Sequence, residues 1–104
     1  MEGIELVCFK IIAAVGSARS CYIEAMRAAT NGKIEEAYAK IEEGEKEFVV
    51  AHQAHGELIT EEANGNKTDV CLLLLHAEDQ LMSAETMKIV AEEHIELCKK
   101  LNLK

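Results

Sequence analysis

Residues 4–29, IELVCFKIIAAVGSARSCYIEAMRAA, carry an apolar stripe whose spacings alternate between four and three residues. The stripe consists of Ile4, Cys8, Ile11, Val15, Ala18, Tyr22, Ala25 and Ala29. Its period is that of an α-helix with one face toward a protein interior. The stretch therefore predicts a long amphipathic helix that needs partners to cover its apolar face.

Two clusters of turn-forming residues divide the rest of the chain, which contains no proline. They are Thr30-Asn31-Gly32 and Asn64-Gly65-Asn66, and the helical period returns after each of them. Short connections make neighbouring helices antiparallel. The sequence therefore predicts an all-α protein, an antiparallel up-down-up three-helix bundle that forms a single domain over residues 1–104.

The last third of the chain carries more apolar surface than one seam of a bundle can cover. A first stripe and a second stripe run side by side along the predicted helix, and two adjacent stripes make its apolar face unusually wide. We therefore expect this helix to be buried twice, within its own subunit and against other subunits. The first stripe is Leu72, Leu75, Asp79, Met82, Thr86 and Ile89, and the second is Val70, Leu74, Ala77, Leu81 and Ala84.

The composition argues against several classes of partner. The chain has a formal net charge of −8, whereas nucleic-acid binding needs clustered Lys and Arg. The longest uninterrupted apolar run, residues 70–75, is far shorter than the roughly 20 residues that span a bilayer. Four cysteines with no C-x-x-C pair and no secretory leader are typical of reduced cytosolic thiols. We expect a cytoplasmic protein with no nucleic-acid partner and no direct membrane insertion.

The stretch LLLLHAEDQLM, residues 72–82, is the candidate for chemistry. On a helix, His76 shares a face with Asp79 and Gln80, because these residues lie three and four positions further on. A neutral imidazole can accept a phosphoryl group on one nitrogen while a hydrogen bond to the other fixes the tautomer. His76 is therefore a candidate nucleophile, with an ordinary surface or core histidine as the alternative.

Asp79 lies in the first apolar stripe, where an unpaired buried carboxylate would cost several kcal/mol. Protonation, a cationic side chain or a metal ion would compensate it, and the neighbouring stripes offer no Lys or Arg. One Asp79 from each subunit around a symmetry axis would suit a hard cation such as Mg²⁺. The alternative is that Asp79 is hydrated at the rim of the bundle.

His55 falls in the stripe of the middle helix, so we expect it near the site on the third helix, where it can form a hydrogen bond. His52 and His55 form an H-x-x-H pair, but no further zinc ligands are evident around it. The stripe of the middle helix is Ile34, Ala37, Ile41, Gly44, Phe48, Ala51, His55 and Leu58.

Over essentially its whole length the chain resembles the enzyme IIA component of the lactose/cellobiose (chitobiose) class of the bacterial phosphoenolpyruvate sugar phosphotransferase system. The strongest piece is HAEDQLM at residues 76–82, which is similar to the family's H-A-Q-D-H-L-M. GSARS at residues 16–20 and EEANG at residues 61–65 support it. Three departures stand out: Glu78 in place of Gln, Gln80 in place of the second His, and His55 where the family pattern places Gln.

The resemblance implies a phosphoryl carrier for the uptake of a disaccharide of the lactose, cellobiose or chitobiose type. His76 would receive the phosphoryl group from the phosphocarrier protein HPr and pass it to a cysteine of enzyme IIB. The family also implies a homotrimer with Asp79 from each subunit around a divalent ion on the axis. The alternative is a non-catalytic helical adaptor or assembly module, and the imported sugar is left open.

Overall fold

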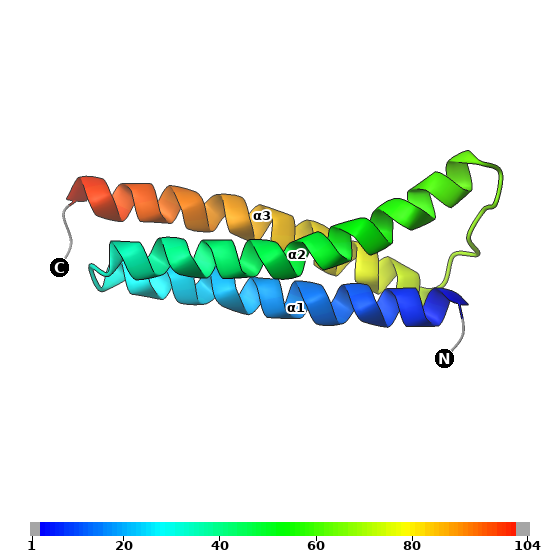
Figure 1. Cartoon of the computed structure of the whole chain (residues 1–104), viewed down its shortest axis with the longest axis horizontal. Coiled ribbons are helices and arrows are strands. Elements are labelled where there is room, and N and C mark those ends of the chain that lie inside the picture. Colours follow the sequence, from blue (N-terminus) through cyan, green and yellow to red (C-terminus); the bar gives the residue numbers. More distant parts are fainter. Residues whose placement is uncertain (1–2, 102–104) are drawn as a thin grey trace.

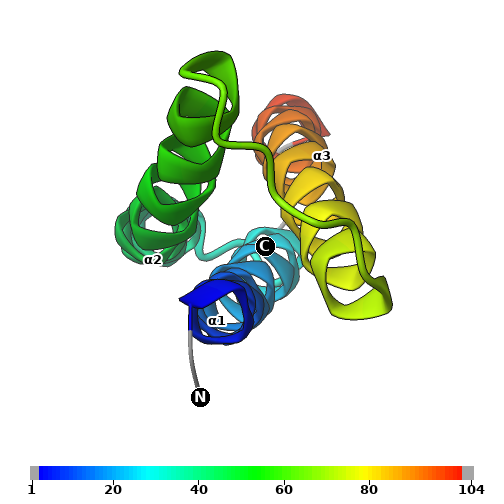
Figure 2. The ribbon, with the colours of Figure 1, turned by 90° about the vertical axis from the view of Figure 1, so that its right-hand side faces the viewer.

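The computed structural model describes residues 3–101, which form three α-helices and no strand. They are α1 (Gly3–Thr30), α2 (Ile34–Ala63) and α3 (Leu72–Leu101). The chain runs up α1, down α2 and up α3, and the end-on view shows the helices at the corners of a triangle (Figures 1 and 2). The predicted all-α, up-down-up three-helix bundle is therefore confirmed.

Both connections between helices begin at the predicted clusters of turn residues. α1 ends at Thr30, and Gly32 in the short turn to α2 has a φ of 78°. α2 ends at Ala63, and Gly65 has a φ of 91°. This left-handed backbone region favours glycine, which has no Cβ to clash with the chain. The two glycines thus explain why α1 and α2 end where they do.

α1 is the central helix of the bundle, because it packs extensively against both α2 and α3 while those two touch each other much less. Of its predicted stripe, every residue is buried except Ile4, which is half-buried. By length and composition alone, α1 is long and apolar enough to cross a membrane. A count of uninterrupted apolar residues does not detect this property of α1. Its position between two helices accounts for the buried part of that composition, whereas Leu6 and Phe9 are exposed.

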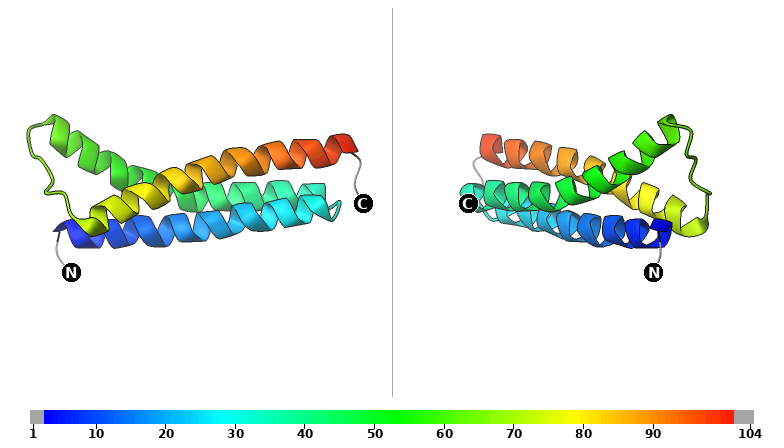
Figure 3. Two further views of the ribbon diagram at one scale, coloured as in Figure 1. Left: turned by 180° about the vertical axis from the view of Figure 1, so that it is seen from behind. Right: turned by 45° about the vertical axis from the view of Figure 1, so that its right-hand side comes forward.

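The end of the bundle that carries the α2–α3 connection is open. There the last part of α2 diverges from the other two helices, and residues 64–71 return the chain across the gap to α3 (Figures 1 and 3). The buried residues of α2 accordingly stop at Ala54; Leu58 is half-buried and Ile59 is exposed. The first turns of α3 therefore have less cover than the remainder of the helix.

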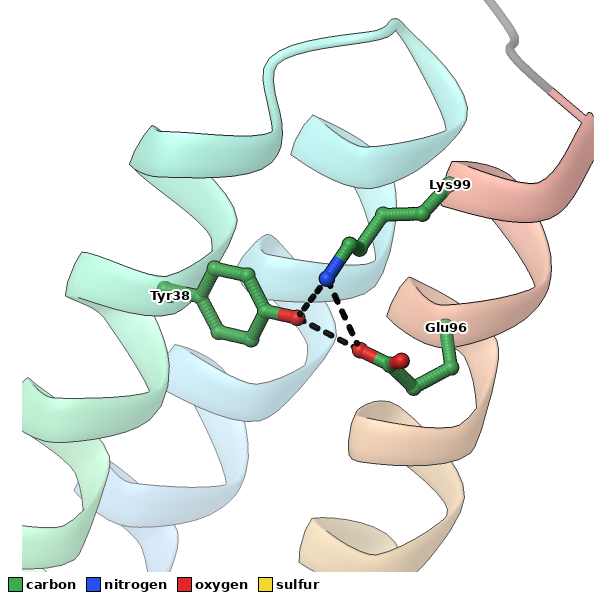
Figure 4. A network of polar contacts seen from close by, with 3 residues as sticks. All are labelled: Tyr38, Glu96 and Lys99. Atoms are coloured by element: carbon green, nitrogen blue, oxygen red, sulfur yellow. Dashed lines mark hydrogen bonds and ion pairs between the residues drawn. The ribbon is translucent and has the colours of Figure 1, made fainter.

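The opposite end is held by a polar network between α2 and α3 (Figure 4). The Tyr38 hydroxyl donates to Glu96 Oε2 at 2.5 Å, and Lys99 Nζ donates to the Tyr38 oxygen at 3.1 Å. The hydrogen bond from Tyr38, followed by the charge of Lys99, lowers the pKa of Glu96. These exposed contacts lie near the C-terminal end of α3, more than five turns from His76, and belong to the scaffold.

Gly44 allows α1 and α2 to approach closely at Tyr22. A Cβ at residue 44 would lie 2.6 Å from Tyr22 Cε1 and 3.0 Å from Cys21 Cβ. Tyr22 is fully buried, its hydroxyl has no hydrogen-bond partner among the described residues, and burial raises its pKa. The contacts would be with ring atoms of Tyr22 and with Cys21 Cβ next to the backbone, so rotation of a flexible side-chain end cannot relieve both.

We therefore expect Gly44→Ala to lower the free energy of unfolding by about 1 to 2 kcal/mol, because overpacking outweighs the gain in helix propensity. Gly56→Ala is the matched control. A Cβ at residue 56 of α2 would meet nothing within 4 Å, so this variant should gain up to about 1 kcal/mol. Urea denaturation measures both, and equal changes in the two variants would contradict the packing argument.

Candidate functional site

His76 lies in the second turn of α3, on the open half of the bundle. Its side chain is exposed and, with Leu72 and Leu73, lines a shallow apolar hollow. Among residues 3–101 it takes part in none of the side-chain hydrogen bonds or ion pairs. Within the described residues the imidazole is thus accessible, forms no hydrogen bond and has apolar side chains on one side.

The two apolar stripes of α3 differ in their burial. The second stripe packs into the bundle from Leu74 onward, with Ala77, Leu81 and Ala84 buried. The prediction is wrong for Val70, which lies in the loop before α3 and is 72% exposed. The first stripe faces outward, where Leu75 is 54% and Met82 58% exposed. The expected burial of α3 within its own subunit is therefore confirmed for one stripe, and the other remains an uncovered apolar face.

Asp79 lies on that outward face and is exposed. The seam expected around it does not exist inside a single chain, so in one chain the carboxylate needs no compensating partner. No cluster of three or more metal-ligating side chains forms within residues 3–101. One chain therefore contributes a single carboxylate ligand, and a metal site at Asp79 would require other copies of the chain.

His55 reaches α3 as the sequence predicted, and its partner there is Glu78. The distance between His55 Nε2 and Glu78 Oε1 is 2.6 Å. The two side chains come from different helices and are 18% and 37% exposed. Both residues depart from the family pattern, and the helical period places His55 near the third helix without identifying Glu78 as its partner.

The remaining histidines are held away from the His76 site. The ring of His52 lies 6.2 Å from that of Phe48, centroid to centroid, and its side chain is otherwise exposed. His94 Nε2 lies 2.8 Å from Thr30 Oγ1 and joins the end of α1 to α3. Among residues 3–101, His52 and His55 share no hydrogen-bond partner.

The model of one protein family, described as "PTS system, Lactose/Cellobiose specific IIA subunit", matches residues 6–99. The chain belongs to this family. It is therefore a IIA component of the sugar phosphotransferase system, and the resemblance noticed in residues 76–82 is confirmed for almost the whole chain.

Characterised relatives of this IIA protein cover nearly the same residues. The lichenan-specific phosphotransferase enzyme IIA component of Bacillus subtilis is 44% identical over 100 residues, which are 96% of this chain and 91% of the relative. The oligo-beta-mannoside-specific EIIA component of the same organism is 41% identical over 95% of this chain and 90% of its own length. The lactose-specific EIIA component of Staphylococcus aureus is 34% identical over 95% of this chain and 96% of its own length.

Two solved structures share the fold of this IIA protein. The cellobiose-specific enzyme IIA from Bacillus anthracis superposes with a TM-score of 0.93 at 42% identity, covering 97% of this chain and 93% of the other. PtcA from S. mutans gives a TM-score of 0.89 at 37% identity, covering 95% of this chain and 99% of the other. The open three-helix arrangement is therefore shared with proteins of clearly related sequence.

Proposed function

We propose that this IIA protein is a phosphoryl carrier that receives its phosphoryl group on His76. The observation that carries the proposal is the state of that side chain. It is an exposed imidazole with no hydrogen-bond partner among residues 3–101, and it lines an apolar hollow with Leu72 and Leu73. A neutral imidazole has a free lone pair for nucleophilic attack. An apolar surround also lets a partner protein exclude water from the phosphoryl group during transfer.

In the first transfer, HPr is the donor. The lone pair of one His76 nitrogen attacks phosphorus, an N–P bond forms, the bond from phosphorus to HPr breaks, and its electron pair stays with HPr. In the second transfer, a cysteine thiolate of enzyme IIB attacks the same phosphorus. An S–P bond then forms as the N–P bond breaks, and its electron pair returns to the imidazole of His76.

The charge of the chain supports protein partners of this kind. Its formal net charge of −8 would attract basic surfaces around the phosphoryl groups of HPr and speed their encounter at low salt. The sugar itself need not touch the IIA protein, because aromatic residues, which usually line sugar sites, make up only 4% of the chain. We assign the carrier to the cytoplasm and to the uptake of a disaccharide of the lactose, cellobiose or chitobiose type.

A reconstituted relay tests the function as a whole. Phosphoenolpyruvate, enzyme I, HPr and a cognate enzyme IIB are mixed with and without this protein, and phosphorylation of IIB is followed by mass spectrometry. The proposal expects phosphorylated IIB only when the protein is present. A helical adaptor, the alternative function, would bind its partners yet leave IIB unphosphorylated in both mixtures.

The uncovered stripe of α3 supports assembly into a homotrimer. Exposed apolar side chains follow one face of α3 through Leu75, Met82 and Ile89, and exposed faces of this kind mark protein interfaces. Three copies packed through this face around an axis would bring three Asp79 carboxylates together. Such a set of oxygen ligands fits Mg²⁺, which would offset the mutual repulsion of the carboxylates.

Replacement of Asp79 tests the metal site. We expect Asp79→Asn and Asp79→Leu trimers to lose the bound ion, because each removes the carboxylate charge that holds it. Elemental analysis after dialysis against Mg²⁺ should give about one ion for three wild-type chains, and Asp69→Asn, in the exposed loop before α3, should keep that ratio. A wild-type trimer without an ion would refute the site.

A further inference from the structure

One polar contact joins α2 to α3 beside the proposed phosphoryl acceptor. His55 Nε2 lies 2.6 Å from Glu78 Oε1, a distance typical of charge-assisted hydrogen bonds. Among the described residues, the other polar contacts between these helices, Lys88 with Glu45 and the Tyr38 network, lie further along α3. The His55–Glu78 contact is therefore the one closest to His76.

The contact also sits where α2 begins to leave the bundle. Ala54, the residue before His55, is the last buried residue of α2, and beyond it the helix diverges from α3 (Figure 3). Glu78 in turn lines the groove that opens between the two helices, together with Leu58 and Leu74. The pair thus links the diverging segment of α2 to the turn of α3 that carries His76.

Glu78 matters electrostatically because it is two residues from His76. Positions i and i+2 project from different sides of a helix, so the carboxylate does not contact the imidazole directly. Its charge nevertheless acts through space within roughly a Debye length, about 8 to 10 Å at moderate salt. A phosphoryl group on His76 brings negative charge close to this carboxylate, and the resulting repulsion would favour return of the group to the donor.

We propose that His55 and Glu78 are positioning residues for phosphoryl transfer at His76, which rests on the carrier function proposed above. His55 binds the Glu78 carboxylate and holds it toward α2, away from the phosphoryl group. Neither residue touches the reacting atoms. The pair tunes how stably His76 holds the phosphoryl group and fixes α2 beside the α3 turn from which transfer occurs.

Amide substitutions separate this role from a purely structural one. His55→Gln, Glu78→Gln and the double variant are each equilibrated with phosphorylated HPr, and the phosphoryl exchange constant is measured by intact mass. We expect His55→Gln to shift the equilibrium toward HPr by about fivefold, because a glutamine amide binds the carboxylate more weakly than the imidazole and lets it move toward the phosphoryl group. Adding Glu78→Gln should restore the wild-type constant to within about twofold, because no carboxylate is then left at residue 78 to repel the phosphoryl group.

Glu85→Gln is the matched control, since it removes an exposed carboxylate from α3 more than two turns beyond His76 and should leave the constant unchanged. An unchanged constant in His55→Gln, or a double variant as impaired as that single variant, would overturn the role of the pair. A wild type that accepts no phosphoryl group would instead refute the carrier function and, with it, any role of the pair in transfer.

Discussion

Replacing His76 with Ala is expected to lower phosphoryl transfer from HPr to enzyme IIB by about 10³-fold or more. The imidazole is the only nucleophile proposed at the site, and without it neither N–P bond formation nor relay to the IIB cysteine can occur. Because the side chain is exposed and forms no hydrogen bond among the described residues, the free energy of unfolding should change by less than about 0.5 kcal/mol. Rapid-quench kinetics of the reconstituted relay, together with urea denaturation, measure both quantities.

His52→Ala is the control for this experiment. His52 is also an exposed histidine on a helix, but it lies on α2 and packs near Phe48. The His52→Ala protein should transfer phosphoryl groups at close to the wild-type rate. A His76→Ala protein that still supplies IIB, or a His52→Ala protein that does not, would place the acceptor elsewhere.

The second large effect is expected on assembly. Introducing Glu at both Leu75 and Met82 would put two charges per subunit into the uncovered stripe of α3, next to Asp79. Burying unpaired carboxylates at an interface costs several kcal/mol per chain, so the proposed trimer should dissociate into monomers over the micromolar range. Sedimentation equilibrium gives the mass directly.

Ile59→Glu is the control for assembly, because Ile59 is as exposed as Met82 but belongs to the diverging segment of α2. It should remain trimeric. If wild type sediments as a monomer, or if the charged α3 variant still sediments as a trimer, the outward stripe is not the trimer interface.

Much of the fold follows from the sequence because a helix repeats its contacts at a fixed period. The stripe of α1 predicted which residues are buried, and the Thr30-Asn31-Gly32 and Asn64-Gly65-Asn66 clusters predicted where two helices end. The wide apolar face of α3 was also recognisable. Periodicity alone did not reveal which stripe faces inward, because that depends on how α3 is rotated against α1.

Features that depend on three-dimensional packing were not accessible in the same way. The helical period places Gly44 in the stripe of the middle helix, and only its distance from the Tyr22 ring shows why a side chain is unfavourable there. The divergence of α2 after Ala54 leaves no mark in the helical period. His55 and Glu78 lie 23 residues apart in the sequence, so their contact emerges only when α2 and α3 are placed side by side.

The most direct test of the phosphoryl carrier is to locate the phosphoryl group itself. The protein is incubated with phosphoenolpyruvate, enzyme I and HPr at neutral pH, and the intact and fragmented chain is analysed by mass spectrometry under conditions that preserve phosphohistidine. We predict one acid-labile phosphoryl group per chain, located on His76 and absent from His76→Ala. A folded protein that gains no phosphoryl group, or gains it on another of its four histidines, would contradict the assignment.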